Sequence, residues 1–191
     1  MDFHTLCTGC RTYRRFKQKQ IPEEILDELL ENARIANSAM NGQPLRYVLV
    51  KTSEAVRKIQ PCFHFAAALP KELGQPKEGE QPAAFIILCT EGRETPWTGI
   101  DIGIAVRTMN LNAYIHGVGS CIIGNVEFEK VKEILSIPET WIPRLALALG
   151  YPSHKSTIVE LPEDGSVKYY LDEERQYYVP KRKRKDISII R

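Results

Sequence analysis

The sequence lacks the short motifs that mark several common enzyme classes. It contains no G-x-x-x-x-G-K-S/T phosphate loop, no H-E-x-x-H zinc motif and no G-x-S-x-G nucleophile motif. Gly117-Val118-Gly119 follows a predicted helix rather than a strand, so a Rossmann dinucleotide site is not expected. The four histidines are isolated, and we interpret each as structural. No protein nucleophile or general base stands out, which favours an enzyme whose reactive atom belongs to a cofactor.

A strong charge imbalance and long apolar runs are also missing. The chain has 26 Lys and Arg against 24 Asp and Glu, for a net charge of +2, so nucleic acid is not an expected partner. No apolar stretch is long enough to span a bilayer. The N-terminal sequence has neither the basic start nor the apolar run of a signal peptide. We therefore expect no membrane partner and a cytoplasmic location.

The cysteines do not form a recognisable metal or disulfide framework. There are five of them, an odd and mostly scattered set, which indicates reduced thiols. Cys7-Thr8-Gly9-Cys10 is a C-x-x-C pair, but no second pair follows to complete a zinc or iron–sulfur site. We favour two ordinary thiols, with a redox or metal role as the alternative.

Hydrophobic periodicity predicts helices that alternate with buried strands, which indicates layers of helices and sheet. At 191 residues the chain fits a single domain over residues 1–191. The predicted elements are a short helix or loose arm over 1–10, a helix from Pro22 to Ala36, a strand over 46–51, a helix capped by Ser53 that ends near Ile59, an irregular segment over 60–82, a strand over 83–89, a helix over 100–116, a strand over 120–124, a helix over 127–135 and a strand over 145–150.

Two of these segments carry further expectations. The helix over 100–116 is apolar nearly all round, so we expect its own fold or a partner chain to cover both of its sides. Residues 60–82 form a long segment of a kind that often serves as a lid or binding loop.

The stretch Ala33–Val50 joins the end of a helix to a strand through a turn rich in amide and hydroxyl groups. Such a turn suits a polar planar ligand, although an ordinary helix-to-strand loop has a similar composition. Two basic clusters, over 11–19 and 181–185, lie at opposite ends of the chain. Arginine and hydroxyl side chains can converge on one phosphate, and the alternative is a solvated basic surface.

Four stretches, in order and spacing, resemble the small FMN-dependent nitroreductases. They are R-T-Y-R-R-F at 11–16, A-N-S-A-M-N-G-Q-P-L-R at 36–46, the D-I-G-I-A helix at 101–105 with G-V-G-S-C at 117–121, and L-G-Y-P at 149–152 with the basic segment over 181–187. The resemblance implies an α+β, three-layer fold with a central, mostly antiparallel sheet flanked by helices. It also implies a homodimer with a long buried central helix.

The resemblance also implies which residues bind FMN. They are Arg11, Thr12 and Arg14, chiefly at the phosphate; Ser38 and Asn41, from the other subunit; Gln43 and Pro44, which follow in the same motif; Ile123 and Gly124, beside the isoalloxazine ring; and Arg182 and Arg184, at the phosphate. Three positions depart from the family pattern: Cys10 for an arginine, Asn37 for a proline and Leu45 for a tryptophan. No residue of 60–80 matches the usual contact to the pyrimidine edge of the flavin.

The implied activity is a ping-pong transfer of reducing equivalents from NADH or NADPH, through FMN, to a small-molecule acceptor. Nitroaromatics, quinones and flavins are the expected acceptors. We expect Arg14 to supply a cation near N1 and O2 of the flavin, and a backbone N–H near Gly124 to face N5. The alternatives are a related flavoprotein with other reductive chemistry, such as dehalogenation, and a non-enzymatic flavin-binding or redox-sensing protein.

Overall fold

The computed structural model describes residues 1–191, apart from the side chain of Lys71. The α-helices are α1 (Phe3–Gly9), α2 (Glu23–Arg34), α3 (Ser53–Ile59), α4 (Lys71–Gly74), α5 (Thr98–Ile115) and α6 (Phe128–Ile134), and the 3₁₀ turns are η1 (Ala39–Asn41), η2 (Gln60–Cys62) and η3 (Arg184–Asp186). The strands are β1 (Phe16–Lys17), β2 (Leu45–Val50), β3 (Ala84–Glu91), β4 (Gly119–Ile123), β5 (Trp141–Pro152), β6 (Ser156–Glu160), β7 (Tyr170–Leu171) and β8 (Tyr177–Lys181).

The main sheet is antiparallel throughout. Its strands run in the order β1-β5-β3-β2, and β4 also pairs with β5. Every one of these pairings is antiparallel. Helices that alternate with strands therefore do not make parallel crossovers here, and the predicted α+β fold with a mostly antiparallel sheet is confirmed.

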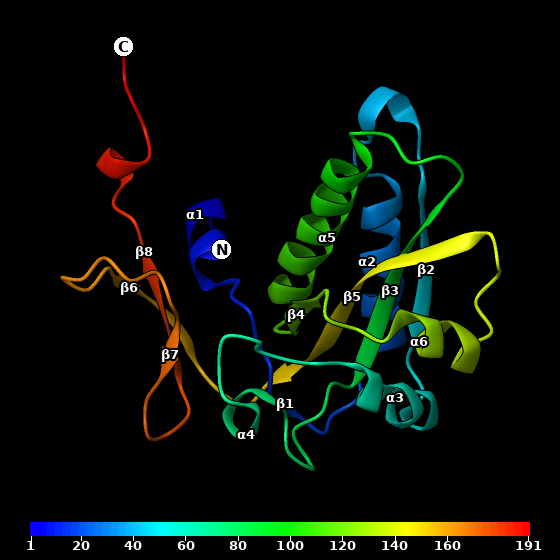
Figure 1. The fold of residues 1–191 in the computed structure, drawn as a ribbon, viewed down its shortest axis with the longest axis horizontal. Coiled ribbons are helices and arrows are strands. Elements are labelled where there is room, and N and C mark those ends of the chain that lie inside the picture. Colours follow the sequence, from blue (N-terminus) through cyan, green and yellow to red (C-terminus); the bar gives the residue numbers. More distant parts are fainter.

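Alternate residues of β3 point into two different apolar cores, because successive strand side chains point to opposite faces of the sheet. Phe85 and Ile87 pack in the core that holds residues of α3 and α6. Ile86 and Leu88 pack in the core that holds residues of α2 and α5. The sheet thus lies between two layers of helices, as Figure 1 shows.

Two motif glycines let the N-terminal arm cross the main sheet. A Cβ on Gly119 would lie 2.8 Å from Cδ2 of Tyr13, and one on Gly150 would lie 2.7 Å from Cδ1 of Phe16. Real Cβ atoms do not approach other atoms so closely. These glycines therefore position the arginine-rich segment against β4 and β5.

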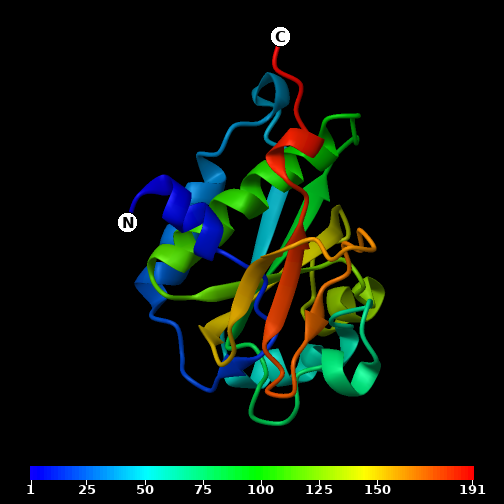
Figure 2. The same cartoon turned by 90° about the vertical axis from the view of Figure 1, so that its left-hand side faces the viewer.

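A second, smaller sheet was not predicted from the sequence. In it β6 pairs in parallel with β8, and β7 pairs antiparallel with β8. Figure 2 shows this sheet facing the viewer, in front of the main layers. Its strands are short and largely polar or half-exposed, so they lack the apolar runs that marked the strands of the main sheet.

Several predicted boundaries were displaced. The side chain of Thr52, not Ser53, caps α3 by accepting a hydrogen bond from the N–H of Ala55 at 3.3 Å. Helix α5 begins two residues earlier than predicted, at Thr98. The segment over 60–82 is partly helical, since it contains η2 and α4.

Helix α5 is covered on one side only within this chain. Ala105 and Met109 are buried against the sheet, whereas Ile100, Ile104 and Ile115 are 52%, 37% and 58% exposed. The single chain leaves this apolar stripe uncovered among the described residues, so the expectation that a partner chain covers it stays a prediction. Among the described residues no helix has the length and apolar character needed to span a membrane.

Candidate functional site

The arginine-rich segment is held at the start of β4. Thr12 pairs with Ser120 in a parallel β-bridge, and the N–H of Tyr13 donates to the carbonyl of Ser120 at 2.9 Å. The buried hydroxyl of Ser120 donates in turn to Oδ1 of Asn110 on α5, at 3.0 Å. The backbone that carries the candidate phosphate-binding residues is therefore fixed by strand and helix together.

A cavity of about 210 Å³ brings Arg14, Ile123 and Gly124 together. Its lining is Arg14, His64, Phe65, Ala66, Ala67, Cys121, Ile122, Ile123, Gly124, Asn125 and Tyr169. We call it the Arg14 cavity. Three segments that were predicted separately thus meet in one place: the basic cluster, the end of the third predicted strand, and part of the segment over 60–82.

Among the described residues the guanidinium of Arg14 has no hydrogen-bond or ion-pair partner. No acidic side chain or carbonyl among the described residues makes an ion pair or hydrogen bond with it. The residue is half-buried and borders the cavity. A partly desolvated cation with its N–H donors free can bind an anionic or carbonyl-bearing ligand.

Arg11 and Thr12 are not among the residues that line this cavity, although they precede Arg14 in the same segment. One guanidinium nitrogen of Arg11 donates to the carbonyl of Cys7 at 2.6 Å, at the end of α1. Its Nε is buried and has no hydrogen-bond partner in the described chain. The side chain of Thr12 is exposed. Both residues retain donors for an anion, as a phosphate-binding role requires.

The second group of predicted residues lines a different cavity, of about 150 Å³. Ser38, Gln43 and Pro44 lie there with Asp101 of α5. Oδ1 of Asp101, which is 4% exposed, accepts a hydrogen bond from the N–H of Ala39 at 2.9 Å and so ties η1 to the start of α5. In Figure 1 this end of α5 is at the top, whereas β4 starts below its other end. The two groups are therefore far apart within one chain.

The loop over 38–44 has an unusual backbone. Met40, Asn41 and Gln43 have φ angles of 52°, 54° and 46°, in the left-handed region that glycine prefers. Such a conformation costs a non-glycine residue roughly 1–2 kcal/mol. The hydroxyl of Ser38 accepts from the N–H of Gln43 at 3.1 Å and helps to hold the loop, while Asn41 is exposed. Clustered strain of this kind is typical of functional segments.

Arg182 and Arg184 follow β8 in the C-terminal segment, and both are exposed. In the described chain no hydrogen bond, ion pair or common cavity joins their side chains to Arg11 or Arg14. Within one chain the structure thus does not bring the two basic clusters together. Their predicted contact with a phosphate stays a prediction.

Sequence reasoning missed an aromatic group beside Arg14. The ring of His154 lies 5.5 Å from that of Tyr13 and 4.9 Å from that of Tyr177. His154 is 7% exposed. Burial, together with the nearby Arg15, lowers the pKa of His154 to about 4, so the ring is neutral at neutral pH. The paired tyrosines at 169–170 and 177–178 were the available signal.

The cysteines show no sign of a metal centre. All five are free, and burial raises the pKa of Cys10, which disfavours a reactive thiolate. Within the part of the chain that the structure describes, no three His, Cys, Asp or Glu side chains form a group that could hold a metal ion.

The chain was then compared with known proteins. Over 150 residues it is 29% identical to a protein of Methanothermobacter thermautotrophicus whose name combines NADH dehydrogenase and NAD(P)H nitroreductase, covering 75% of this chain and 73% of that protein. It is 26% identical to an FMN reductase of Bacillus subtilis, over 78% of this chain and 65% of the relative.

A solved structure from Exiguobacterium sibiricum, assigned as a nitroreductase and determined in complex with FMN, shares the fold. Its TM-score is 0.68 and its identity 19%, over 86% of this chain and 95% of the other. The model of the nitroreductase family matches residues 8–151, which is more than half of the chain. The predicted family is confirmed: the chain belongs to the nitroreductase family.

Proposed function

We propose that the protein binds FMN and uses it to transfer electrons from NADH or NADPH to an oxidised small molecule in a ping-pong cycle. The observation that carries this proposal is the guanidinium of Arg14, which borders a cavity with Ile123 and Gly124 and has no acceptor among the described protein groups. A ligand with carbonyl oxygens that gains negative charge on reduction, such as an isoalloxazine, matches that chemistry.

Family membership supports the reaction class. Members of the nitroreductase family are oxidoreductases by name, and the Bacillus subtilis relative is an FMN reductase that uses NAD(P)H. The Exiguobacterium sibiricum structure contains FMN in the same fold. The chain is thus an NAD(P)H-dependent, flavin-using oxidoreductase, and the acceptor is the part that the proposal leaves to experiment.

The residues of this chain fit FMN by their chemistry. Arg11 has a buried Nε without a partner, and together with Thr12 it offers donors to a phosphomonoester, which carries close to two negative charges. Arg14 would offset negative charge on the ring system, and the backbone at Ile123 and Gly124 would lie alongside it. Bound FMN supplies the electron-transfer chemistry, whereas the protein binds, orients and shields the reactants.

We further propose that two copies of the chain complete the site as a homodimer. Ser38, Gln43 and Pro44 line a cavity separate from the Arg14 cavity, and Asn41 lies in the same loop, so within one chain we do not expect the two groups to contact one ligand. The exposed apolar stripe of α5 offers a surface that a second copy would cover. In this arrangement residues 1–191 act as one FMN-binding unit in the cytoplasm, where the five free thiols would stay reduced.

Optical spectroscopy of the purified protein tests the proposal. The protein should carry, or take up, one FMN per chain, which gives a yellow colour and raises its thermal stability. Under anaerobic conditions NADH or NADPH should then bleach the flavin absorbance. A colourless protein whose melting temperature does not respond to FMN would refute the proposal.

A panel of acceptors would separate the related activities. The bleached protein is mixed anaerobically with a nitroaromatic, a quinone or a halogenated phenol, and return of the yellow colour is followed. Rapid reoxidation by the first two supports the proposed reductase. Reoxidation by the halogenated phenol alone would favour reductive dehalogenation, and failure of NADH and NADPH to bleach would favour a binding protein.

A further inference from the structure

The cation of Arg14 is held between two tyrosine rings. Its central guanidinium carbon lies 4.7 Å from the ring centroid of Tyr169 and 4.9 Å from that of Tyr177. The two rings are 6.0 Å apart and inclined at 43°. Both distances are within the range of a cation–π contact. We call this pair of rings the tyrosine clamp.

The clamp comes from a part of the chain outside the family match. The matched residues end at Tyr151, whereas Tyr177 belongs to β8 and Tyr169 directly precedes β7. Both tyrosines therefore belong to the smaller C-terminal sheet and its connections. This sheet reaches back to the N-terminal arginine segment, as Figure 2 shows for β8 in front of the main layers.

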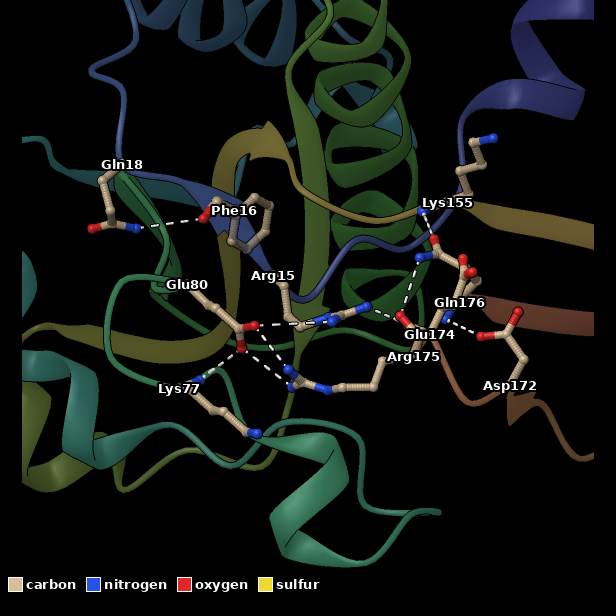
Figure 3. A network of polar contacts seen from close by, with 10 residues as sticks. All are labelled: Arg15, Phe16, Gln18, Lys77, Glu80, Lys155, Asp172, Glu174, Arg175 and Gln176. Atoms are coloured by element: carbon tan, nitrogen blue, oxygen red, sulfur yellow. Dashed lines mark hydrogen bonds and ion pairs between the residues drawn. The ribbon is translucent and has the colours of Figure 1, made fainter.

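Salt bridges fix this sheet to the body of the protein. Nη1 and Nη2 of Arg175 donate to the two carboxylate oxygens of Glu80, at 2.8 and 3.2 Å. The buried guanidinium of Arg15 donates to the carbonyl of Arg175 and lies 3.9 Å from Glu80. Figure 3 shows the three side chains converging between the loop over 75–82 and the turn before β8.

The contacts of this network favour the ionised form of Glu80. Burial acts to raise the pKa of Glu80, but hydrogen bonds from Arg175 and from the backbone of Lys77 outweigh it and hold the pKa below its usual value. Because Tyr177, two residues after Arg175, is only 1% exposed, its ring is packed firmly. One side of the clamp is thus rigidly placed, and the half-buried Tyr169 closes the other side.

Tyr169 contacts Arg14 and also lines the Arg14 cavity. A cation–π contact uses the positive charge of the guanidinium and leaves its N–H donors free. The clamp can therefore orient Arg14 without consuming the hydrogen bonds that a ligand needs. A long side chain without such support would lose rotamer freedom on binding, at a cost in affinity.

We propose that Tyr169 and Tyr177 are positioning residues that hold the Arg14 guanidinium toward an anionic or carbonyl-bearing ligand in the cavity, which under the proposed function is the flavin. The clamp raises flavin affinity, and it stabilises the reduced, more negative state more than the oxidised state. The smaller C-terminal sheet is thereby part of the binding site. This inference rests on the proposed function.

The experiment compares Tyr169→Ala, Tyr169→Phe and Tyr170→Ala with the wild type. Tyr170 is a matched control, since it is half-exposed on the same sheet and stacks on Tyr178 rather than on Arg14. FMN dissociation constants are measured by fluorescence titration, and flavin midpoint potentials by anaerobic redox titration. Tyr177 is left unchanged because its burial makes substitutions there a risk to folding.

Tyr169→Ala should weaken FMN binding roughly 2- to 30-fold, the range that a cation–π contact supports, and should shift the midpoint potential to a more negative value. Tyr169→Phe should keep both properties, because the ring face remains. Tyr170→Ala should resemble the wild type. In an Arg14→Gln background, Tyr169→Ala should have no further effect on either quantity.

Unchanged affinity and potential in Tyr169→Ala would overturn the clamp and leave the proposed function intact. Equal losses in Tyr169→Ala and Tyr170→Ala, or equal losses in Tyr169→Ala and Tyr169→Phe, would also overturn it, because ring position and ring face would then not matter. A wild-type protein that binds no FMN would refute the proposed function itself.

Discussion

The two regions that carry the predicted cofactor-binding residues are held in different ways. At the Arg14 cavity the chain is supported from three sides, by β4, by the segment over 64–67 and by the tyrosine clamp. The loop over 38–44 is exposed at its tip and contains three non-glycine residues at positive φ. One region is thus preorganised within the chain, whereas the exposed, strained loop is the region that we propose a second copy contacts.

The largest expected effect concerns the exposed apolar stripe of α5, which includes Ile104. Ile104→Glu should yield a monomer that binds no FMN, because an unpaired carboxylate in an apolar interface is strongly unfavourable. Ile134→Glu on α6 is the control, since Ile104 and Ile134 are 37% and 42% exposed. Sedimentation velocity and flavin absorbance report the outcome. A fully FMN-loaded Ile104→Glu dimer would show that this face is not the interface.

The next effect concerns His154, which is buried and packs against Tyr177 of the tyrosine clamp. His154 has a pKa of about 4 against an ordinary value of 6.5. Between these values the unfolded chain binds more protons, so the free energy of unfolding should fall by up to about 3 kcal/mol as pH drops from 6.5 to 4. Urea unfolding at several pH values should show a smaller fall in His154→Gln. Parallel pH profiles for the two proteins would contradict the assignment.

Removing Arg11, whose charge we propose faces the phosphate, should have an effect of similar or smaller size. Arg11→Ala should weaken FMN binding by roughly 1.5–3 kcal/mol, or about tenfold or more, since charge-assisted hydrogen bonds are worth that much. Arg57→Ala, which removes an exposed arginine of α3, is the control and should bind as the wild type does. Equal affinities of Arg11→Ala and wild type would remove Arg11 from the site.

The smallest effect is expected in the strained loop. Ser38→Ala removes the acceptor for the N–H of Gln43, and such a bond contributes about 0.5–1.5 kcal/mol. FMN affinity should fall a few-fold, while the unfolding midpoint should change little because the loop is exposed. Isothermal titration and thermal melts measure both. A large drop in stability without a change in affinity would make the loop purely structural.

The sequence allowed most of the main sheet to be predicted, because β3 and β5 are long apolar runs. The antiparallel pairing did not follow from periodicity; it came from the family resemblance. The smaller sheet was missed because its residues, such as those of β6, alternate too weakly between apolar and polar to mark strands.

In the site, likewise, residues within motifs were predicted and residues outside them were missed. Arg14, Ile123 and Gly124 were predicted from motifs and do meet in one cavity. Tyr169 and His154 were not predicted, because a tyrosine in a polar segment and an isolated histidine carry no local pattern. Their positions depend on contacts between residues far apart in sequence, such as the 4.9 Å approach of His154 to Tyr177. Only the folded chain brings such pairs together.

The central claim is that the Arg14 cavity of one copy and the loop over 38–44 of another form one flavin site. Mixing two inactive variants tests it most directly. Arg14→Ala disables the cavity, and Asn41→Trp, at an exposed position, blocks the loop's approach. Each variant alone should bind FMN only weakly, although titration at high FMN concentration still measures its affinity. Mixed dimers should regain one wild-type site each, measured as tightly bound flavin after subunit exchange. If mixing restores no binding, both halves of the site belong to the same chain and the claim is wrong.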